Sequence, residues 1–258
     1  MVPARIPQVL TIAGSDSSAG AGIQADLKIF QAHKVYGTTV VTAVTAQNSK
    51  KVWESLDLPV SLIQAQFKAI MEEFNIKAVK TGMLSSPEII AAVSGSILKY
   101  QIKNLIIDPV MVSKTGYNLL KKEGIKTLKS RLLPLALLVT PNFQEAEVLS
   151  GLKIESLQTM KKAAKKIKDS GCRAVLIKTG DAPFNRGNDL FWDGKNFIVF
   201  ESKLIQGRSP HGTGCVFSAA ITAEIALGED LISAIKKAKL FISKAIKNAR
   251  SQWIMEKL

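Results

Sequence analysis

The sequence has 258 residues, of which 47% are hydrophobic and 22% charged, so the chain can bury a large core and general disorder is excluded. The formal net charge is +14, but the lysines gather on helical segments without the interleaved aromatic side chains on which bases stack. We therefore expect no nucleic-acid partner, and we expect the positive potential to attract anionic substrates.

Strand-like and helix-like patterns alternate along the chain. In the first half, strands are expected at 9–13, 38–45, 78–81 and 105–107, and helices at 21–31, at 61–74 and from Pro87 onward. In the second half, strands are expected at 135–140 and 174–178, a hairpin at 188–201, and helices at 159–169, 214–227 and 231–252. This order predicts an α/β fold with a mostly parallel sheet, in a single domain over residues 1–258. Ligands of such sheets bind beyond the carboxyl ends of the strands, so the residues that follow each strand are the candidates for function.

The segment at 211–215 reads His-Gly-Thr-Gly-Cys and opens the helix predicted at 214–227. Gly212 and Gly214 allow a tight turn around Thr213, and the first amides of a helix have no internal partner. The segment therefore suits an anion such as a phosphoryl group in transfer, although an ordinary turn with a helix cap would have the same pattern. Cys215 lies in the first helical turn, whose field is expected to lower the thiol pKa below about 8.5 and make the sulfur a proton acceptor. The alternative for Cys215 is a small buried side chain.

Candidate ligand contacts follow the first three strands. The segment at 13–22 is rich in small residues, including Gly14, which would let a ligand lie close to the backbone. Asp26 could accept a hydrogen bond from a ligand or be an ordinary first-turn carboxylate. Gln47 can donate and accept at once, which suits the edge of a heteroaromatic ring such as an aminopyrimidine. Met83 could pack on a flat ring or belong to the core.

Oxygen-bearing side chains follow the next strands. Asp108, Asn142 and Glu145 carry the kind of oxygen atoms that Mg2+ and its waters prefer. Each alone would be a turn residue or a helix cap, but together at adjacent strand ends they favour a metal and phosphate site. Lys178 adds a cation where a nucleotide phosphate could lie, although single lysines are usually just exposed.

The sequence contains no pattern typical of secretion or of a membrane span. No apolar stretch reaches the roughly 18 residues of a membrane-spanning helix, and the N-terminus lacks a signal-peptide pattern. The two cysteines, Cys172 and Cys215, are too few for a disulfide framework. We expect a cytoplasmic protein with no membrane partner.

Six motifs in this order resemble those of the ribokinase-like superfamily, and within it the hydroxymethylpyrimidine/phosphomethylpyrimidine kinases of thiamine biosynthesis. The motifs are Ala13-Gly14-Ser15-Asp16-Ser17, Gly20-Ala21-Gly22-Ile23-Gln24-Ala25-Asp26-Leu27-Lys28, Thr45-Ala46-Gln47-Asn48, Lys80-Thr81-Gly82-Met83-Leu84, Asp108-Pro109-Val110-Met111 and His211-Gly212-Thr213-Gly214-Cys215. Any one of them would be weak evidence, but the ordered set is specific. The resemblance runs from about Val9 to the last helix.

The resemblance implies a three-layer α/β/α fold and a homodimer. It also implies two ATP-dependent phosphorylations with Mg2+, first of 4-amino-5-hydroxymethyl-2-methylpyrimidine and then of its monophosphate to the diphosphate. Carried over by motif, the pyrimidine pocket would be lined by Gly14, Asp26, Gln47, Met83 and Val110. ATP would be bound by Asp108, Asn142, Glu145 and Lys178, with Mg2+ at Asp108 and Glu145. The anion hole would consist of Gly212, Thr213 and Gly214, with Cys215 in the position of the base.

Two segments depart from the pattern of these kinases. Where the family usually has three glycines after Ser17, this chain has Ser18-Ala19-Gly20. Where it usually has two glycines and a histidine after Lys178, this chain has Thr179-Gly180-Asp181. Sugar kinases of the superfamily carry an aspartate where Cys215 stands. A carboxylate there would repel a monophosphate acceptor, whereas a thiol can stay neutral.

Two other functions are open at this point. Pyridoxal or pyridoxine kinase activity is the nearest, because related enzymes accept several hydroxymethyl heteroaromatic compounds. A non-catalytic nucleotide-binding or pyrimidine-sensing module is the other. The joint presence of Asp108, Asn142, Glu145, Lys178 and Cys215 argues against a module without catalysis.

Overall fold

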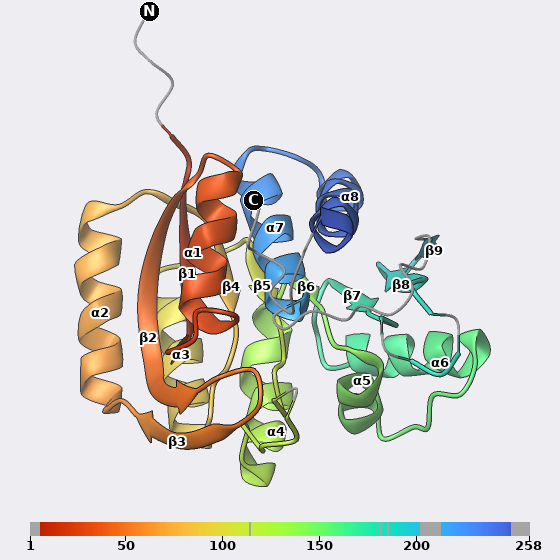
Figure 1. The fold of residues 1–258 in the computed structure, drawn as a ribbon, viewed down its shortest axis with the longest axis horizontal. Helices are drawn as coiled ribbons and strands as arrows, with labels where there is room; N and C mark the ends of the chain where they lie inside the picture. Colours follow the sequence, from red (N-terminus) through yellow and green to blue (C-terminus); the bar gives the residue numbers. More distant parts are fainter. Residues whose placement is uncertain (1–5, 114, 181, 185, 202–212, 249–258) are drawn as a thin grey trace, which may run out of the picture.

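The computed structural model describes residues 6–113, 115–180, 182–184, 186–201 and 213–248. Within these residues, nine strands form one sheet in the order β3-β2-β1-β4-β5-β6-β7-β8-β9 (Figure 1). The strands are β1 Gln8–Asp16, β2 Tyr36–Gln47, β3 Val52–Asp57, β4 Ile76–Thr81, β5 Leu105–Ile107, β6 Leu138–Val139, β7 Ala174–Ile177, β8 Asp189–Trp192 and β9 Phe197–Phe200. The six strands from β2 to β7 in this order run parallel to one another, while β3, β8 and β9 pair antiparallel at the two edges.

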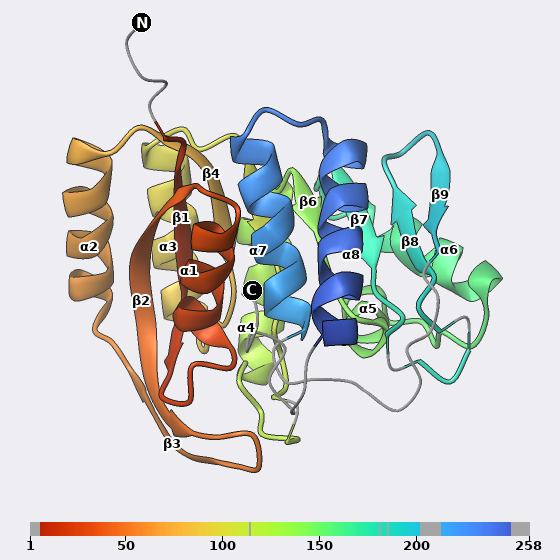
Figure 2. The same cartoon turned by 45° about the horizontal axis from the view of Figure 1, so that its top comes forward.

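The helices lie on both faces of the sheet (Figure 2). One face is covered by α1 Gly22–Ala32, α7 Thr213–Ala226 and α8 Leu231–Asn248. The other face is covered by α2 Val60–Glu73, α3 Pro87–Lys99, α4 Lys122–Thr127, α5 Phe143–Ser150 and α6 Leu157–Lys168. No helix in the described part of the chain is both long and apolar enough to cross a membrane.

The central strands are apolar on both faces, which explains why helices cover both. In β7, Ala174 and Leu176 belong to the core cluster beneath α7 and α8, while Val175 and Ile177 belong to the cluster on the opposite face. Successive side chains of a strand point to opposite faces, so a continuous apolar run needs cover on each side. The fold class predicted from the sequence, with its mostly parallel sheet in three layers, is confirmed.

The strand β3, the helices α4 and α5, and a π-helical turn at Leu128–Leu132 were not predicted. The strand β3 has exposed residues and owes its place to antiparallel pairing with β2, where Val44 lies opposite Leu56. The strand expected at 135–140 is reduced to Leu138–Val139, because Pro134 belongs to a 3-10 turn that precedes it. The hairpin at 188–201 is confirmed as β8 and β9. The last residues of the helix expected at 231–252 lie outside the described part of the chain.

Candidate active site

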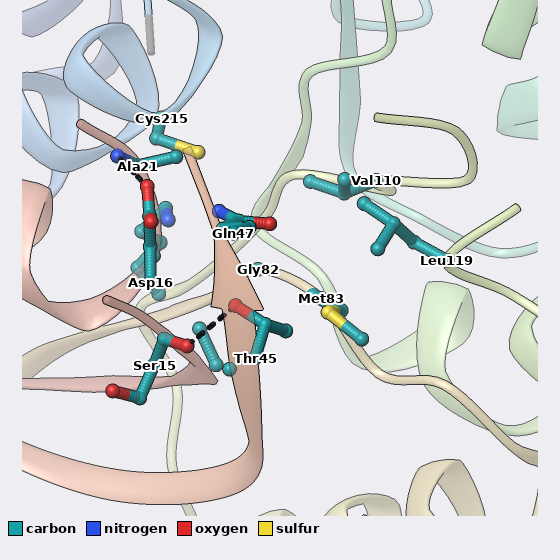
Figure 3. A pocket seen from close by; sticks show the side chains of 14 residues that line it. Ser15, Asp16, Ala21, Thr45, Gln47, Gly82, Met83, Val110, Leu119 and Cys215 are labelled. Carbon is teal, nitrogen blue, oxygen red and sulfur yellow. Dashed lines mark hydrogen bonds between the residues drawn. The ribbon is translucent and has the colours of Figure 1, made fainter. Parts of the chain in front are cut away.

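A pocket lies at the carboxyl ends of β1, β2 and β4, beside the first turns of α1 and α7 (Figure 3). Four of the five residues predicted to bind the substrate line it: Gly14, Gln47, Met83 and Val110. Cys215 lines it as well. Figure 3 shows Gln47 and Cys215 on one side, facing the apolar side chains of Met83 and Val110 on the other. The structure brings these residues together as expected, and their contact with a substrate stays a prediction.

Two glycines give the pocket its close-packed wall. A Cβ atom on Gly14 would lie 3.1 Å from the sulfur of Met83. Gly22 has a φ of +62°, and a Cβ atom there would lie 2.5 Å from the carbonyl oxygen of Gly14. Because a side chain at Gly22 would be both strained and in collision, only glycine fits at this start of α1.

The loop between β1 and α1 is held by Asp16. Its carboxylate accepts hydrogen bonds from the amide and the hydroxyl of Ser18, each at 2.8 Å, and from the amide of Ala21 at 2.8 Å. Ala19 has a φ of +56°, a conformation that glycine adopts more readily. Ser18 and Ala19, which replace glycines of the family pattern, are not among the residues that line the pocket. The side chains of Ser18 and Ala19 therefore affect the loop between β1 and α1 rather than the wall of the pocket.

Asp26, the fifth residue predicted to bind the substrate, does not line the pocket. It is fully buried, and its two carboxylate oxygens accept hydrogen bonds from Nζ of Lys80 at 2.9 and 2.8 Å. The hydroxyl of Thr11 donates a third hydrogen bond to the same carboxylate at 2.5 Å. Burial alone would lower the pKa of Lys80, but the adjacent carboxylate raises it above its ordinary value, so the lysine is charged. In this structure Lys80, not Asp26, is the member of the pair that reaches the pocket.

A second buried ion pair, between Asp108 and Lys178, lies beside Gly214 at the start of α7. Lys178, just after β7, donates from Nζ to Oδ1 of Asp108 at 2.8 Å, and the hydroxyl of Ser218 on α7 lies 3.1 Å from Oδ2. Burial alone would raise the pKa of Asp108, but the charge of Lys178 holds it below its usual range. Asp108 is therefore an ionised carboxylate at the end of β5.

Asn142 and Glu145 form the cap of α5. The side-chain oxygen of Asn142 accepts a hydrogen bond from the Glu145 amide at 2.8 Å, and the Glu145 carboxylate accepts one from the Asn142 amide at 2.8 Å. This reciprocal arrangement is a capping box, so the cap that the sequence left open as an alternative exists. Burial raises the pKa of Glu145 to about 7, and the charge of Lys178 opposes that shift. Glu145 thus lies within electrostatic reach of the Asp108–Lys178 pair.

The start of α7 lies between the pocket and this second ion pair. Cys215 faces the pocket, whereas a Cβ atom on Gly214 would lie 3.3 Å from Nζ of Lys178. Thr213 is the first residue of the helix, and Gly212 lies outside the described residues. A ligand in the pocket and an anion beside Lys178 would therefore meet at the first amides of α7.

The expected lowering of the Cys215 pKa is wrong. Burial raises the pKa of this thiol to about 11, and the charge of Lys80 only partly opposes the shift. The thiolate would lose its hydration and would face the negative charges of Asp108 and Asp26, and these effects outweigh the Lys80 charge and the Gly22 backbone hydrogen bond that favour it. Cys215 is a neutral thiol in the resting protein.

The donor set fits a phosphate-bound magnesium ion better than a metal held by protein alone. Among the described residues, no group of three His, Cys, Asp or Glu side chains could hold a metal ion. Mg2+ usually needs only one or two carboxylates, because waters and substrate phosphates complete its shell. Asp108 and Glu145 would supply those carboxylates.

The sheet and its helices are those of ribokinase-like small-molecule kinases. A profile of the family described as phosphomethylpyrimidine kinase matches residues 16–254. A hydroxymethylpyrimidine/phosphomethylpyrimidine kinase of Aquifex aeolicus (strain VF5) is 44% identical over 241 residues, which are 93% of this chain and 94% of that protein. The chain belongs to the phosphomethylpyrimidine kinase family and is a kinase.

Solved structures agree with this assignment. A crystal structure of a phosphomethylpyrimidine kinase from Clostridium difficile 630 is 43% identical with a TM-score of 0.84, over 94% of this chain and 100% of that one. An ADP complex of Bacillus subtilis pyridoxal kinase is 41% identical with a TM-score of 0.88, over 96% of this chain and 95% of that one. The fold is thus shared by kinases named for two different heteroaromatic substrates.

The sequence analysis assigned no separate role to Lys80 or Ser218. The sequence does contain a signal for Lys80. A lysine near the end of an apolar central strand costs free energy when it is buried, unless its charge is paired. Ser218 gives no such signal, since a serine in a helix commonly bonds to a carbonyl of the preceding turn. Its hydroxyl lies 3.2 Å from the Gly214 carbonyl oxygen and 3.1 Å from the carboxylate of Asp108.

Proposed function

We propose that this kinase transfers a phosphoryl group from ATP to 4-amino-5-hydroxymethyl-2-methylpyrimidine, and then a second one to the resulting monophosphate, in thiamine biosynthesis. The observation that carries the proposal is the position of the α7 start, with Cys215 in the pocket and Gly214 against the Asp108–Lys178 pair. The acceptor would lie in the pocket and the ATP phosphates beside Lys178. Family membership supplies the identity of the acceptor.

The pocket has the chemistry that an aminopyrimidine needs. The Gln47 amide would donate to and accept from the edge of the ring. Met83 and Val110 would pack on its faces, and Gly14 would let the ring lie close to the backbone. The backbone of Gln47 is fixed by Ser17. The Ser17 hydroxyl lies 2.9 Å from the backbone nitrogen of Gln47 and 2.9 Å from its backbone carbonyl oxygen. The side-chain amide of Gln47 therefore extends from a fixed backbone.

The ATP side would be formed by Asp108, Asn142, Glu145 and Lys178. Lys178 would contact a phosphate, and Asp108 with Glu145 would hold Mg2+ through its waters. When bound, the ion neutralises charge on the phosphate oxygens. Asn142 keeps Glu145 in place through the cap of α5. The amides of Gly212, Thr213 and Gly214 would face the oxygens of the phosphoryl group in transfer, with Gly212 proposed on sequence alone.

Cys215 would lie beside the acceptor oxygen in both reactions. In the first reaction a hydroxyl proton must leave as the oxygen bonds to phosphorus. The sulfur would accept that proton as the thiolate, once the thiol has given its own proton to solvent. In the second reaction the acceptor is a phosphate oxygen that is already anionic. A neutral thiol, consistent with a pKa of about 11, would not repel that phosphate.

The test is to incubate the protein with Mg-ATP and either the hydroxymethylpyrimidine or pyridoxal, and to identify the products by mass. We expect the pyrimidine monophosphate followed by the diphosphate. If no pyrimidine phosphate forms while the protein is folded and binds ATP, the proposed function is wrong.

Pyridoxal kinase activity is the second candidate, favoured by the 41% identity to the Bacillus subtilis pyridoxal kinase over nearly the whole chain. The same experiment separates the two functions. Phosphorylation of pyridoxal stops at the monophosphate, whereas a pyrimidine diphosphate requires the second reaction. Efficient pyridoxal phosphorylation without any diphosphate would favour this candidate.

We also propose that the chain forms one domain, acts as a homodimer in the cytoplasm, and has no nucleic-acid or membrane partner. The single sheet from β1 to β9 supports one domain. The homodimer is supported by an exposed apolar pair on the edge of that sheet, Val44 on β2 and Leu56 on β3, which are 47% and 65% exposed. Such a pair is typical of a surface that another chain covers.

A further inference from the structure

Ser218 carries a buried hydroxyl on α7 that the proposed function does not use. Its oxygen lies 3.1 Å from Oδ2 of Asp108, 3.2 Å from the carbonyl oxygen of Gly214 and 3.1 Å from that of Cys215. All three are acceptors, and a hydroxyl has one proton to donate. The role of Ser218 therefore depends on which acceptor receives that proton.

The carboxylate of Asp108 is the strongest of the three acceptors. The carbonyl oxygens of Gly214 and Cys215 are neutral, and inside a helix such oxygens already face the amides of the next turn. Asp108 is 2% exposed and ionised, and a hydrogen bond to a charged acceptor is about twice as strong as one between neutral groups. If the proton pointed elsewhere, the lone pairs of the hydroxyl would face a carboxylate oxygen at 3.1 Å. The Ser218 hydroxyl therefore donates to Asp108.

The two carboxylate oxygens of Asp108 are held by different donors. Nζ of Lys178 donates to Oδ1 at 2.8 Å, and the hydroxyl of Thr140 lies 3.4 Å from the same oxygen. Among the hydrogen bonds within the described part of the chain, Ser218 is the donor to Oδ2. A carboxylate held at one oxygen can turn about its Cβ–Cγ bond, whereas one held at both oxygens cannot. Ser218 thus completes the fixation of the carboxylate from the α7 side.

We propose that Ser218 is a positioning residue that holds the Asp108 carboxylate in the orientation that receives phosphate-bound Mg2+. Without the hydroxyl, the carboxylate is free to turn and to pair more fully with Lys178, which leaves it less able to hold the ion. The same hydroxyl ties Asp108 to the helix whose first amides are proposed to face the phosphoryl group. The inference rests on the proposed function only in that Asp108 holds Mg2+.

The experiment measures binding of ADP rather than activity. The Kd of ADP is determined by isothermal titration calorimetry, once with excess Mg2+ and once with EDTA. We expect the parent to bind ADP more tightly with Mg2+. Loss of a residue that orients a metal ligand typically weakens the metal site by tenfold or more, so we expect Ser218→Ala to raise the Kd measured with Mg2+ by about tenfold. Its Kd in EDTA should stay close to that of the parent.

Thr222→Val is the matched control. Thr222 lies one turn further along α7, is equally buried, and donates its hydroxyl to the Ser218 carbonyl oxygen at 2.8 Å. Both variants remove a buried hydroxyl from the same helix, but only Ser218 has a hydrogen bond to Asp108 among the described residues. We expect Thr222→Val to bind ADP like the parent under both conditions. Circular dichroism and thermal melting establish that each variant is folded.

A double-mutant cycle with Asp108→Asn tests whether Ser218 acts through Asp108. We expect Asp108→Asn to weaken binding of ADP with Mg2+, and Ser218→Ala to weaken it no further in that background. An unchanged Kd with Mg2+ in Ser218→Ala, an equal loss in Thr222→Val, or additive losses in the double variant would overturn the inference. An Asp108→Asn variant with the affinity of the parent would overturn it together with the metal role of Asp108. The titration contains no acceptor, so failure to phosphorylate a pyrimidine is a separate result.

Discussion

At the scale of single residues, the chemistry of the site depends on which charges are buried together. Cys215 lies in the first turn of α7, where an exposed thiol would ionise readily. Burial instead raises its pKa to about 11, since a thiolate would lose hydration next to Asp108 and Asp26. The same neutrality suits an enzyme whose second acceptor is a phosphate.

The substitution Cys215→Ala tests this difference between the two acceptors. The first reaction must dispose of a hydroxyl proton, so we expect its kcat/KM to fall by roughly 100-fold or more, as for the loss of a general base. The second reaction has no such proton, and its kcat/KM is expected to change much less. Both are measured by the release of ADP with the pyrimidine or its monophosphate as the acceptor. Equal losses in the two reactions would contradict the role given to Cys215.

Gly22→Ala tests the backbone conformation at the start of α1. The added Cβ atom would occupy a left-handed conformation and lie 2.5 Å from the Gly14 carbonyl oxygen. We expect the free energy of unfolding to fall by about 2–4 kcal/mol, from strain and overpacking together. Gly151→Ala is the matched control, because its φ is +68° but its nearest neighbour would be 3.8 Å away. Denaturant unfolding should show a clearly smaller loss for Gly151→Ala, and equal losses would mean that the collision is relieved.

At the scale of elements, the residues that cap helix α5 are also residues proposed to bind ATP and Mg2+. Its capping box uses Asn142 and Glu145, which follow the end of β6. The backbone of Lys178 pairs with the segment before α5, since its amide donates to the Pro141 carbonyl oxygen at 2.8 Å. The cap therefore places a buried carboxylate near the lysine that is proposed to bind phosphate.

Two variants separate the cap from the proposed metal site. Glu145→Gln keeps a side chain that can complete a capping box, so we expect thermal stability to change little while Mg-dependent kinase activity falls by about tenfold or more. Asn142→Ala removes the cap itself and is expected to lower the free energy of unfolding by about 1 kcal/mol. Melting curves and initial rates at several Mg2+ concentrations measure both effects. Full activity of Glu145→Gln would remove Glu145 from the metal site.

At the scale of the whole molecule, the two edges of the sheet are antiparallel while its centre is parallel. The β2–β3 edge carries the exposed cross-strand pair Val44 and Leu56. An apolar pair on a sheet edge is a liability for a monomer unless another surface covers it. The homodimer proposed above would cover it.

The double substitution Val44→Lys/Leu56→Lys tests that role. Like charges directly opposite on neighbouring strands repel, and two chains that meet at this edge would bring four such charges together. We expect light scattering to show a monomer for the variant and a dimer for the parent. Leu98→Lys, at a leucine on α3 that is 62% exposed, is the control and should stay dimeric. A variant that keeps the dimer would show that the interface lies elsewhere.

Much of the fold could be predicted because its signals are local. The apolar runs of β5 and β7, Pro87 at the first turn of α3 and the hairpin at 188–201 each depend on near neighbours in sequence. The strand β3 could not be predicted, because it is stabilised by pairing with β2 rather than by burial of its own residues. The helix α5 was missed although its capping signature is present, because Asn142 and Glu145 were interpreted as ligands.

The sequence by itself determined most of the strands and helices, the resemblance to a kinase family, and Cys215 with four further pocket residues, since each depends on local pattern or motif. Only the tertiary structure decided the charge states. Asp26 is paired with Lys80, which lies 54 positions away, and Asp108 with Lys178, which lies 70 positions away. Burial and through-space pairing set whether Cys215 is a thiol or a thiolate, and neither can be seen in the residues beside it in the sequence.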